Sequence, residues 1–235
     1  MERIRRINHL ANKLNSHNYL EIGVRDGETL DGISIPMKTG VDPVFRFDWQ
    51  LAMENTPSLR LHQCTSDEFF LGSLADSSYD FIYLDGLHHY EQTFRDLLHA
   101  IRICSDKGVI LIDDTVPCDA YSCSRDMDEA FSLRRATNPD CHEEWHGDTY
   151  KLIPLINLLL PAYEYITMMD SGNPQTILWK RRNLFLSSEI ETLISFLALD
   201  NLSACDFLWM RRNLHLWHPK TELEAIDLVC SDILQ

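Results

Sequence analysis

Three aspartates stand where two apolar stretches of the sequence end. Asp85 follows the stretch 79–84, and Asp113 and Asp114 follow the stretch 109–112. If these stretches are neighbouring parallel strands, the three carboxylates converge at one edge of a sheet. Converging carboxylates repel one another unless a cation or a proton relieves them. The alternative is that these acids are helix caps and solvated loop residues.

Two histidines follow Asp85 in the loop before the next expected helix. His88 lies three residues after Asp85, and His89 comes next. Removing a proton from a hydroxyl needs a group that titrates near neutral pH, and an imidazole meets this requirement. A lone histidine is more often structural, but the carboxylates nearby make His88 the candidate base. We expect His89 to pack on the following helix or to cap it.

A second constellation, Glu21-x-Gly23-x-x-x-Gly27, follows the first apolar run. Glycines around a strand-to-helix turn let the backbone approach a ligand closely. Asp42 lies 21 residues after Glu21, near the ~20 residues at which an acid ending the second strand binds ribose hydroxyls. The middle glycine of the dinucleotide motif is absent, so a nucleoside without a pyrophosphate fits better. An ordinary tight turn is the alternative.

The elements that must position these residues alternate along the chain. Compact apolar runs predict strands at 19–24, 39–42, 59–63, 79–85 and 109–113, and amphipathic spacing predicts helices over 1–17, 66–71 and 90–104. Such runs are typical of parallel strands buried on both faces. The alternation predicts a doubly wound, mostly parallel, Rossmann-like α/β sheet. A hairpin of 163–168 and 176–180 would add an antiparallel final strand.

Composition limits the partners and the location. Of the 235 residues, 21 are Lys or Arg and 36 are Asp or Glu, a net charge of −15. This charge repels phosphate backbones and anionic membranes, so we expect neither nucleic acid nor membrane as a partner. The sequence shows no run of the ~20 apolar residues that a membrane span needs and no secretory signal. We expect a cytoplasmic protein.

The chain divides into three parts. Residues 1–180 would form the cofactor-binding domain, within which 115–147 are expected to form a lid over the acceptor site. Residues 181–235 would form a helical C-terminal extension. This extension could pack on its own domain or pair subunits into a homo-oligomer.

Six segments, in order, resemble class I S-adenosylmethionine-dependent methyltransferases, in particular the branch of small-molecule and sugar O-methyltransferases that includes the macrolide-sugar enzymes. They are 19–30 (YLEIGVRDGETL), 40–43 (GVDP), 65–70 (TSDEFF), 80–91 (DFIYLDGLHHYE), 108–114 (GVILIDD) and 145–151 (WHGDTYK). The resemblance implies the fold and a site for S-adenosyl-L-methionine.

The resemblance also implies residue roles at the cofactor. Glu21, Gly23 and Gly27 would hold the methionine end, Asp42 would bind the ribose hydroxyls, and Asp85 would also face the cofactor.

A loop beside the adenine would contain Thr65, Ser66 and Asp67. Ser66 could equally be the N-cap of the helix that begins there.

Metal-dependent members of this family bind magnesium through an acid after the fourth strand and an acid pair after the fifth. Asp85, Asp113 and Asp114 match these places, which implies Mg²⁺ or another divalent cation that orients the acceptor hydroxyl and lowers its pKa. His88 matches the histidine that is similar to a general base, with Asp85 beside it as a second catalytic residue.

The segment 145–151 is expected near the acceptor pocket, although Asp148 could merely cap the helix from Thr149. We therefore expect an S-adenosylmethionine-dependent O-methyltransferase that acts on a hydroxyl of a small molecule, a sugar or a glycosylated metabolite, with help from a divalent cation. One alternative is a hydroxylase-like enzyme of an antibiotic pathway on the same fold. Another is a non-catalytic scaffold that uses its helical tail as an interface.

Overall fold

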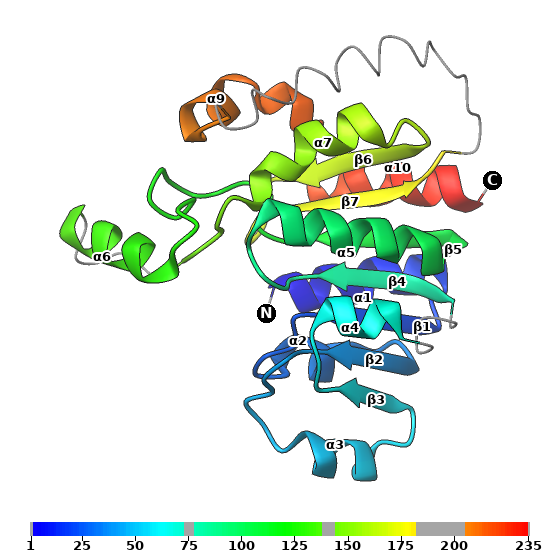
Figure 1. Ribbon diagram of the computed structural model, residues 1–235. Helices are drawn as coiled ribbons and strands as arrows, with labels where there is room; N and C mark the ends of the chain where they lie inside the picture. The colour runs from blue at the N-terminus through cyan, green and yellow to red at the C-terminus, as the bar shows by residue number, and fades with distance from the viewer. Residues whose placement is uncertain (1, 73–77, 138–143, 182–204, 235) are drawn as a thin grey trace.

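A mixed eight-stranded sheet forms the centre of the computed structural model, which describes residues 2–72, 78–137, 144–181 and 205–234 (Figure 1). The strands lie in the order β3-β2-β1-β4-β5-β7-β6-β8. Their bounds are β1 (Asn18–Ile22), β2 (Met37–Val41), β3 (Leu59–His62), β4 (Tyr79–Leu84), β5 (Cys104–Ile112), β6 (Tyr163–Met168), β7 (Gln175–Lys180) and β8 (Pro219–Lys220).

Strands β1 to β5 run parallel, and β7 is inserted antiparallel between β5 and β6. This arrangement confirms the predicted doubly wound, mostly parallel sheet with its antiparallel strand. Chain order reverses between β1 and β4, and ligands of open α/β sheets bind outside the carboxyl ends of the strands at such a point. The candidate residues Glu21, Asp85, Asp113 and Asp114 therefore lie where a ligand is expected.

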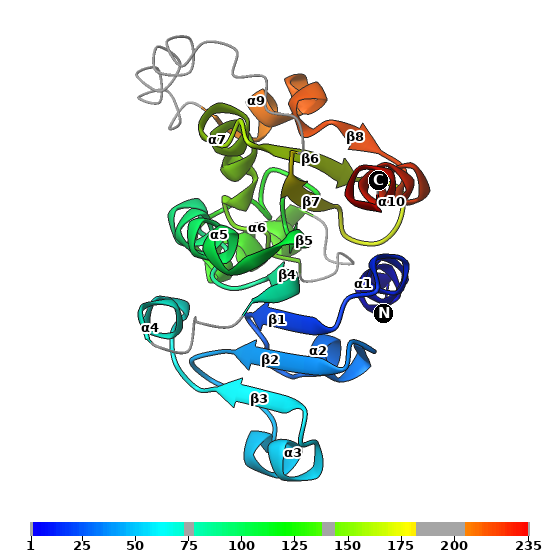
Figure 2. The same ribbon diagram turned by 90° about the vertical axis from the view of Figure 1, so that its right-hand side faces the viewer.

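Helices cover both faces of the sheet (Figure 2). One face carries α1 (Glu2–Leu14), α2 (Glu28–Gly32) and α10 (Glu222–Leu234), and the other carries α4 (Ser66–Leu71), α5 (Tyr90–Ile103) and α7 (Leu152–Leu159). The other helices in the described ranges are α3 (Trp49–Asn55), α6 (Met127–Thr137), α9 (Phe207–Arg212) and the short 3₁₀ turns η2 (Thr149–Lys151) and η4 (Leu214–Trp217). Within the described ranges, no helix has the length and apolarity to cross a membrane.

Each central strand buries both of its faces. In β4, Phe81 and Tyr83 pack on the α1 side, whereas Ile82 and Leu84 pack on the α5 side. β5 divides its apolar residues in the same way. Because both faces are covered, the strands read in the sequence as continuous apolar runs rather than as alternating ones.

Two parts of the chain differ from the expected elements. Residues 115–147 contain α6, which was not predicted and which extends beyond the carboxyl ends of the parallel strands (Figure 1). The described part of 181–235 was expected to be helical only, but it also supplies β8, which pairs with β6. The boundary at residue 180 stays a prediction.

A buried ion pair joins the first and last helices across one face of the sheet. Arg6 of α1 is 1% exposed, and its Nε lies 2.9 Å from Oε2 of Glu222 in α10. Arg6 also donates to Oε1 of Gln175 at 2.6 Å and to the carbonyl of Asn173 at 3.0 Å. The two ends of the chain are thus fixed to each other and to the β6–β7 hairpin.

Removing one partner of a buried ion pair leaves an uncompensated charge in the interior. We therefore expect Glu222→Ala to lower the free energy of unfolding by about 3–5 kcal/mol in urea denaturation. Asp227→Ala is the matched control, because it removes the exposed partner of Lys13 between the same two helices and should lower the free energy of unfolding far less. Similar losses from both substitutions would contradict this account.

Candidate active site

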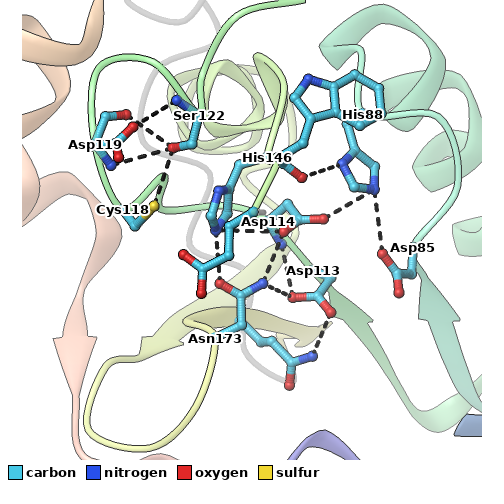
Figure 3. A network of polar contacts seen from close by, with 12 residues as sticks. Asp85, His88, Asp113, Asp114, Cys118, Asp119, Ser122, His146 and Asn173 are labelled. Carbon is cyan, nitrogen blue, oxygen red and sulfur yellow. Dashed lines mark hydrogen bonds and ion pairs between the residues drawn. The ribbon is translucent and has the colours of Figure 1, made fainter. Parts of the chain in front are cut away.

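Three side chains meet at the carboxyl ends of β4 and β5 (Figure 3). His88 Nε2 lies 3.1 Å from Oδ2 of Asp114 and 3.6 Å from Oδ1 of Asp85. One ligand atom from each residue lies within 4.8 Å of the others. Two carboxylate oxygens and an imidazole nitrogen at this spacing form a donor set that suits a divalent cation.

Asp113 lies beside this cluster, but its carboxylate is engaged elsewhere. Its Oδ1 accepts hydrogen bonds from Asn173 Nδ2 at 2.6 Å and from the backbone N–H of Asp114 at 2.9 Å. Its Oδ2 accepts from the Tyr83 hydroxyl and from Gln175 Nε2 at 3.0 Å. The structure thus groups His88, rather than Asp113, with Asp85 and Asp114, and the ligand role of Asp113 stays a prediction.

The segment that includes Trp145 fixes the orientation of His88. The imidazole stacks on the Trp145 indole with ring centroids 4.6 Å apart, and Nδ1 lies 2.9 Å from the Trp145 carbonyl oxygen. The neutral ring therefore carries its hydrogen on Nδ1 and leaves the Nε2 lone pair directed at the carboxylates. Gly147 has φ +56°, and a Cβ there would lie 1.8 Å from the His88 carbonyl oxygen, which accounts for the glycine.

Asp148 caps a helix, though not the one expected. Its Oδ1 accepts a hydrogen bond from the backbone N–H of Tyr90 at 3.1 Å, at the start of α5, and its Oδ2 accepts from Arg125 at 2.9 Å. Asp148 also occupies the N-cap position of η2, as the alternative expected, but its side chain makes no capping hydrogen bond there. His89 occupies the N-cap position of α5, but its side chain makes no capping hydrogen bond; its Nε2 lies 3.1 Å from the Arg125 carbonyl oxygen.

Burial and charge shift the pKa values of the cluster strongly. Burial alone would lower the pKa of His88, but the charges of Asp114 and Asp85 outweigh burial and raise this pKa to about 9. Burial raises the pKa of Asp114 to about 8, although His88 opposes this shift. Burial and the neighbouring Asp113 also raise the pKa of Asp85. The cluster therefore retains a proton at neutral pH unless another cation replaces it.

The predicted methionine end of the cofactor site lies next to this cluster. Gly23 has φ +91°, and a Cβ there would lie 1.9 Å from the Asp85 carbonyl oxygen, so only glycine lets the turn after β1 approach the end of β4 so closely. Gly27 has φ +79° and faces the Phe47 ring. Glu21 is buried and accepts a hydrogen bond from Tyr19 at 2.9 Å, and burial raises its pKa to about 8.

Asp42 lies at the end of β2, at the same edge of the sheet. Its two carboxylate oxygens accept backbone hydrogen bonds from Arg25 at 2.8 Å and from Val44 at 2.7 Å. These bonds orient the carboxylate, and each oxygen keeps a lone pair with which it could accept a ribose hydroxyl. Ribose binding by Asp42 stays a prediction.

The loop predicted beside the adenine begins α4. Thr65, not Ser66, is the N-cap, and it forms a capping box with Glu68. Ser66 accepts a hydrogen bond from Gln92 at 3.1 Å, and Asp67 lies 3.3 Å from Arg95 of α5. Thr65 thus caps α4, and Ser66 and Asp67 at the start of α4 contact side chains of α5. A contact of these three residues with adenine stays a prediction.

Sequence reasoning missed four residues that organise the carboxylates, namely Arg3, Tyr83, Asn173 and Gln175. Tyr83 had a signal, because it lies two residues before Asp85 in a strand and shares its face. Asn173 and Gln175 approach from the β6–β7 hairpin, about 60 residues after Asp113. Nothing in the local sequence relates these distant residues to the cluster.

Comparison with known proteins bears on the domain and on the fold. Residues 20–115 match a family model described as a methyltransferase domain, and no curated protein matches the sequence. A cofactor-bound protein from MTB is similar with a TM-score of 0.56 and 15% identity over 77% of this chain and 80% of that one.

Two further solved structures share the fold. An O-methyltransferase from Bacillus cereus in complex with SAH gives a TM-score of 0.52 at 14% identity, over 76% of this chain and 80% of that one. A candidate caffeoyl-CoA O-methyltransferase from Staphylococcus aureus gives 0.51 at 18% identity, over 76% and 82%. Residues 20–115 thus match a methyltransferase domain, and the chain shares its fold with these solved O-methyltransferases.

Proposed function

We propose that the chain methylates a hydroxyl oxygen of a small molecule, a sugar or a glycosylated metabolite, with His88 as the general base. The observation that carries the proposal is the orientation of His88, whose Nδ1 faces the Trp145 carbonyl oxygen while Nε2 faces the carboxylates at the strand ends. The order of sequence segments and the spacing from Asp85 to His88 favour a sugar acceptor. A cytoplasmic location stays a prediction.

The chain's own residues would perform the proton transfer. S-adenosylmethionine, when bound, supplies a methyl group on a sulfonium sulfur. His88 Nε2, in the deprotonated state of the ring, would accept the proton that the acceptor hydroxyl loses as its oxygen forms the new bond to carbon and the carbon–sulfur bond breaks. Asp85 and Asp114 would stabilise the imidazolium that results. The Trp145 carbonyl and indole would hold the ring in one orientation throughout.

Asp85 and Asp114 would also hold a divalent cation. The fit rests on their oxygens and His88 Nε2, which lie within 4.8 Å of one another, and on the burial of carboxylates that need positive charge. A cation there would supply Lewis acidity that lowers the pKa of the acceptor hydroxyl. The Nε2 lone pair of His88 can bind either the cation or the proton, so the two roles of His88 exclude each other.

The pKa of His88 predicts how its imidazole titrates. With divalent ions removed by chelation, the His88 ring signals in NMR should titrate with a midpoint near pH 9. Asp114→Asn removes one of the two negative charges that raise the pKa of His88. Burial, which lowers this pKa, then has more weight, so the midpoint should fall by at least about one pH unit. A midpoint at or below 6.5 in the unmodified protein would contradict the proposed electrostatics of the cluster.

Loss of the base should affect turnover more than binding. We expect His88→Gln to reduce methyl transfer from labelled cofactor by about 10²–10⁴-fold, while calorimetry shows binding of S-adenosylhomocysteine within about twofold of the unmodified chain. His89→Gln, in the same loop, is the control and should remain active.

Two results would contradict this assignment. If His88→Gln loses Mn²⁺ affinity, His88 is a cation ligand rather than the base. If label never leaves the cofactor in the unmodified chain, the hydroxylase-like alternative gains support and methyl transfer fails as the function.

The cation site predicts a dependence on divalent ions. Chelation should abolish most methyl transfer, and Mg²⁺ or Mn²⁺ should restore it. Asp114→Asn should weaken Mn²⁺ binding at least about tenfold, because it removes a charged ligand. Asp106→Asn, an exposed acid near the opposite end of β5, should bind Mn²⁺ as the unmodified chain does. Unchanged turnover after chelation would exclude the cation while leaving the methyltransferase activity in place.

A further inference from the structure

Arg3 reaches the carboxylates from the first turn of α1. Its Nη1 lies 3.2 Å from Oδ2 of Asp85 and 3.7 Å from Oδ2 of Asp113. The Arg3 side chain is 41% exposed, so it reaches the buried acids from the solvent side. The mechanism above assigns it no role.

Asp85 divides its two oxygens between two neighbours of positive charge. Oδ1 faces His88 at 3.6 Å, within the candidate cation cluster. Oδ2 accepts a hydrogen bond from Arg3 at 3.2 Å, and the Tyr83 hydroxyl oxygen lies at the same distance from it. A cation bound beside His88 and the guanidinium of Arg3 would therefore share one carboxylate.

What Arg3 contributes at Asp113 is charge rather than hydrogen-bonding capacity. The oxygens of Asp113 already accept from Asn173, Gln175 and Tyr83, all of which are neutral donors. Neutral donors satisfy the lone pairs but leave the negative charge, which a nearby guanidinium offsets. Arg3 thus supplies positive charge to this buried carboxylate, whereas its hydrogen-bond donors are neutral.

We propose that Arg3 is a positioning residue that acts as an internal counter-ion of Asp85 and Asp113 and thereby weakens the binding of a divalent cation at Asp85 and Asp114, beside His88. The inference rests on the cation site of the proposed function. A guanidinium repels a dication that shares its carboxylate, and solvent screens this repulsion only partly. In the absence of the cation, Arg3 holds the carboxylates in place from its partly exposed position.

Arg5 provides a matched control on the same helix. Its side chain is 51% exposed, close to the 41% of Arg3, and it pairs with Glu222 and Glu2 instead of the site. Arg5→Gln removes the same charge from α1 without removing it from Asp85. Arg3→Lys keeps the charge at the site and tests whether charge is what matters.

The test is a titration of the full chain with Mn²⁺, in which EPR measures the free ion without cofactor or acceptor. We expect Arg3→Gln to bind Mn²⁺ at least about tenfold more tightly than the unmodified chain, and Arg3→Lys and Arg5→Gln to bind it as the unmodified chain does. The gain should disappear in Arg3→Gln/Asp114→Asn, because the added affinity is assigned to the cluster.

The outcomes separate this inference from the cation site itself. If Mn²⁺ binding depends on Asp114 but is equal or weaker in Arg3→Gln, the cation site stands and the role of Arg3 is wrong. If the gain also appears in Arg5→Gln or survives Asp114→Asn, the effect is a general one of net charge and the inference is likewise wrong. If no variant binds Mn²⁺, the cation site and the inference both fail.

Discussion

The crowding of three carboxylates at the ends of two adjacent strands is the constraint on which the site depends. Asp113 and Asp114 are buried and Asp85 is partly buried, so the negative charge gathered there needs compensation. Compensation comes from His88 and Arg3 as charges and from hydrogen-bond donors around Asp113. Helix α1 and the β6–β7 hairpin, which surround this edge of the sheet, carry Arg3, Asn173 and Gln175.

The interactions that hold the carboxylates join distant parts of the chain. Arg3 belongs to α1, whose neighbour Arg6 is fixed by Glu222 of α10 and by Gln175, and Gln175 in turn donates to Asp113. Folding of the last helix and of the β6–β7 hairpin is therefore coupled to the geometry of the acids. The C-terminal helix contributes to the site without touching it.

The sequence allowed prediction of the parts that depend on local pattern. Buried parallel strands and their terminal acids are visible because apolar runs end on Asp85 and Asp113, and His88 follows at a fixed spacing. The partners of these residues could not be predicted, because Asn173 and Gln175 reach Asp113 only through the strand order β5-β7-β6. The division of roles between Asp113 and Asp114 likewise depends on which oxygen each neighbour occupies, which residue type and spacing do not encode.

Asp148 has a consequence for how acceptor preference can change. It joins the start of α5 to Arg125, at the base of the segment that carries α6, while Trp145 next to it holds the imidazole. The orientation of the proposed base is thereby anchored in the body of the protein, whereas α6 lies further out on the same segment. If His88 is the base, sequence drift in α6 can change what approaches it without disturbing its orientation, so that specificity and chemistry can evolve separately.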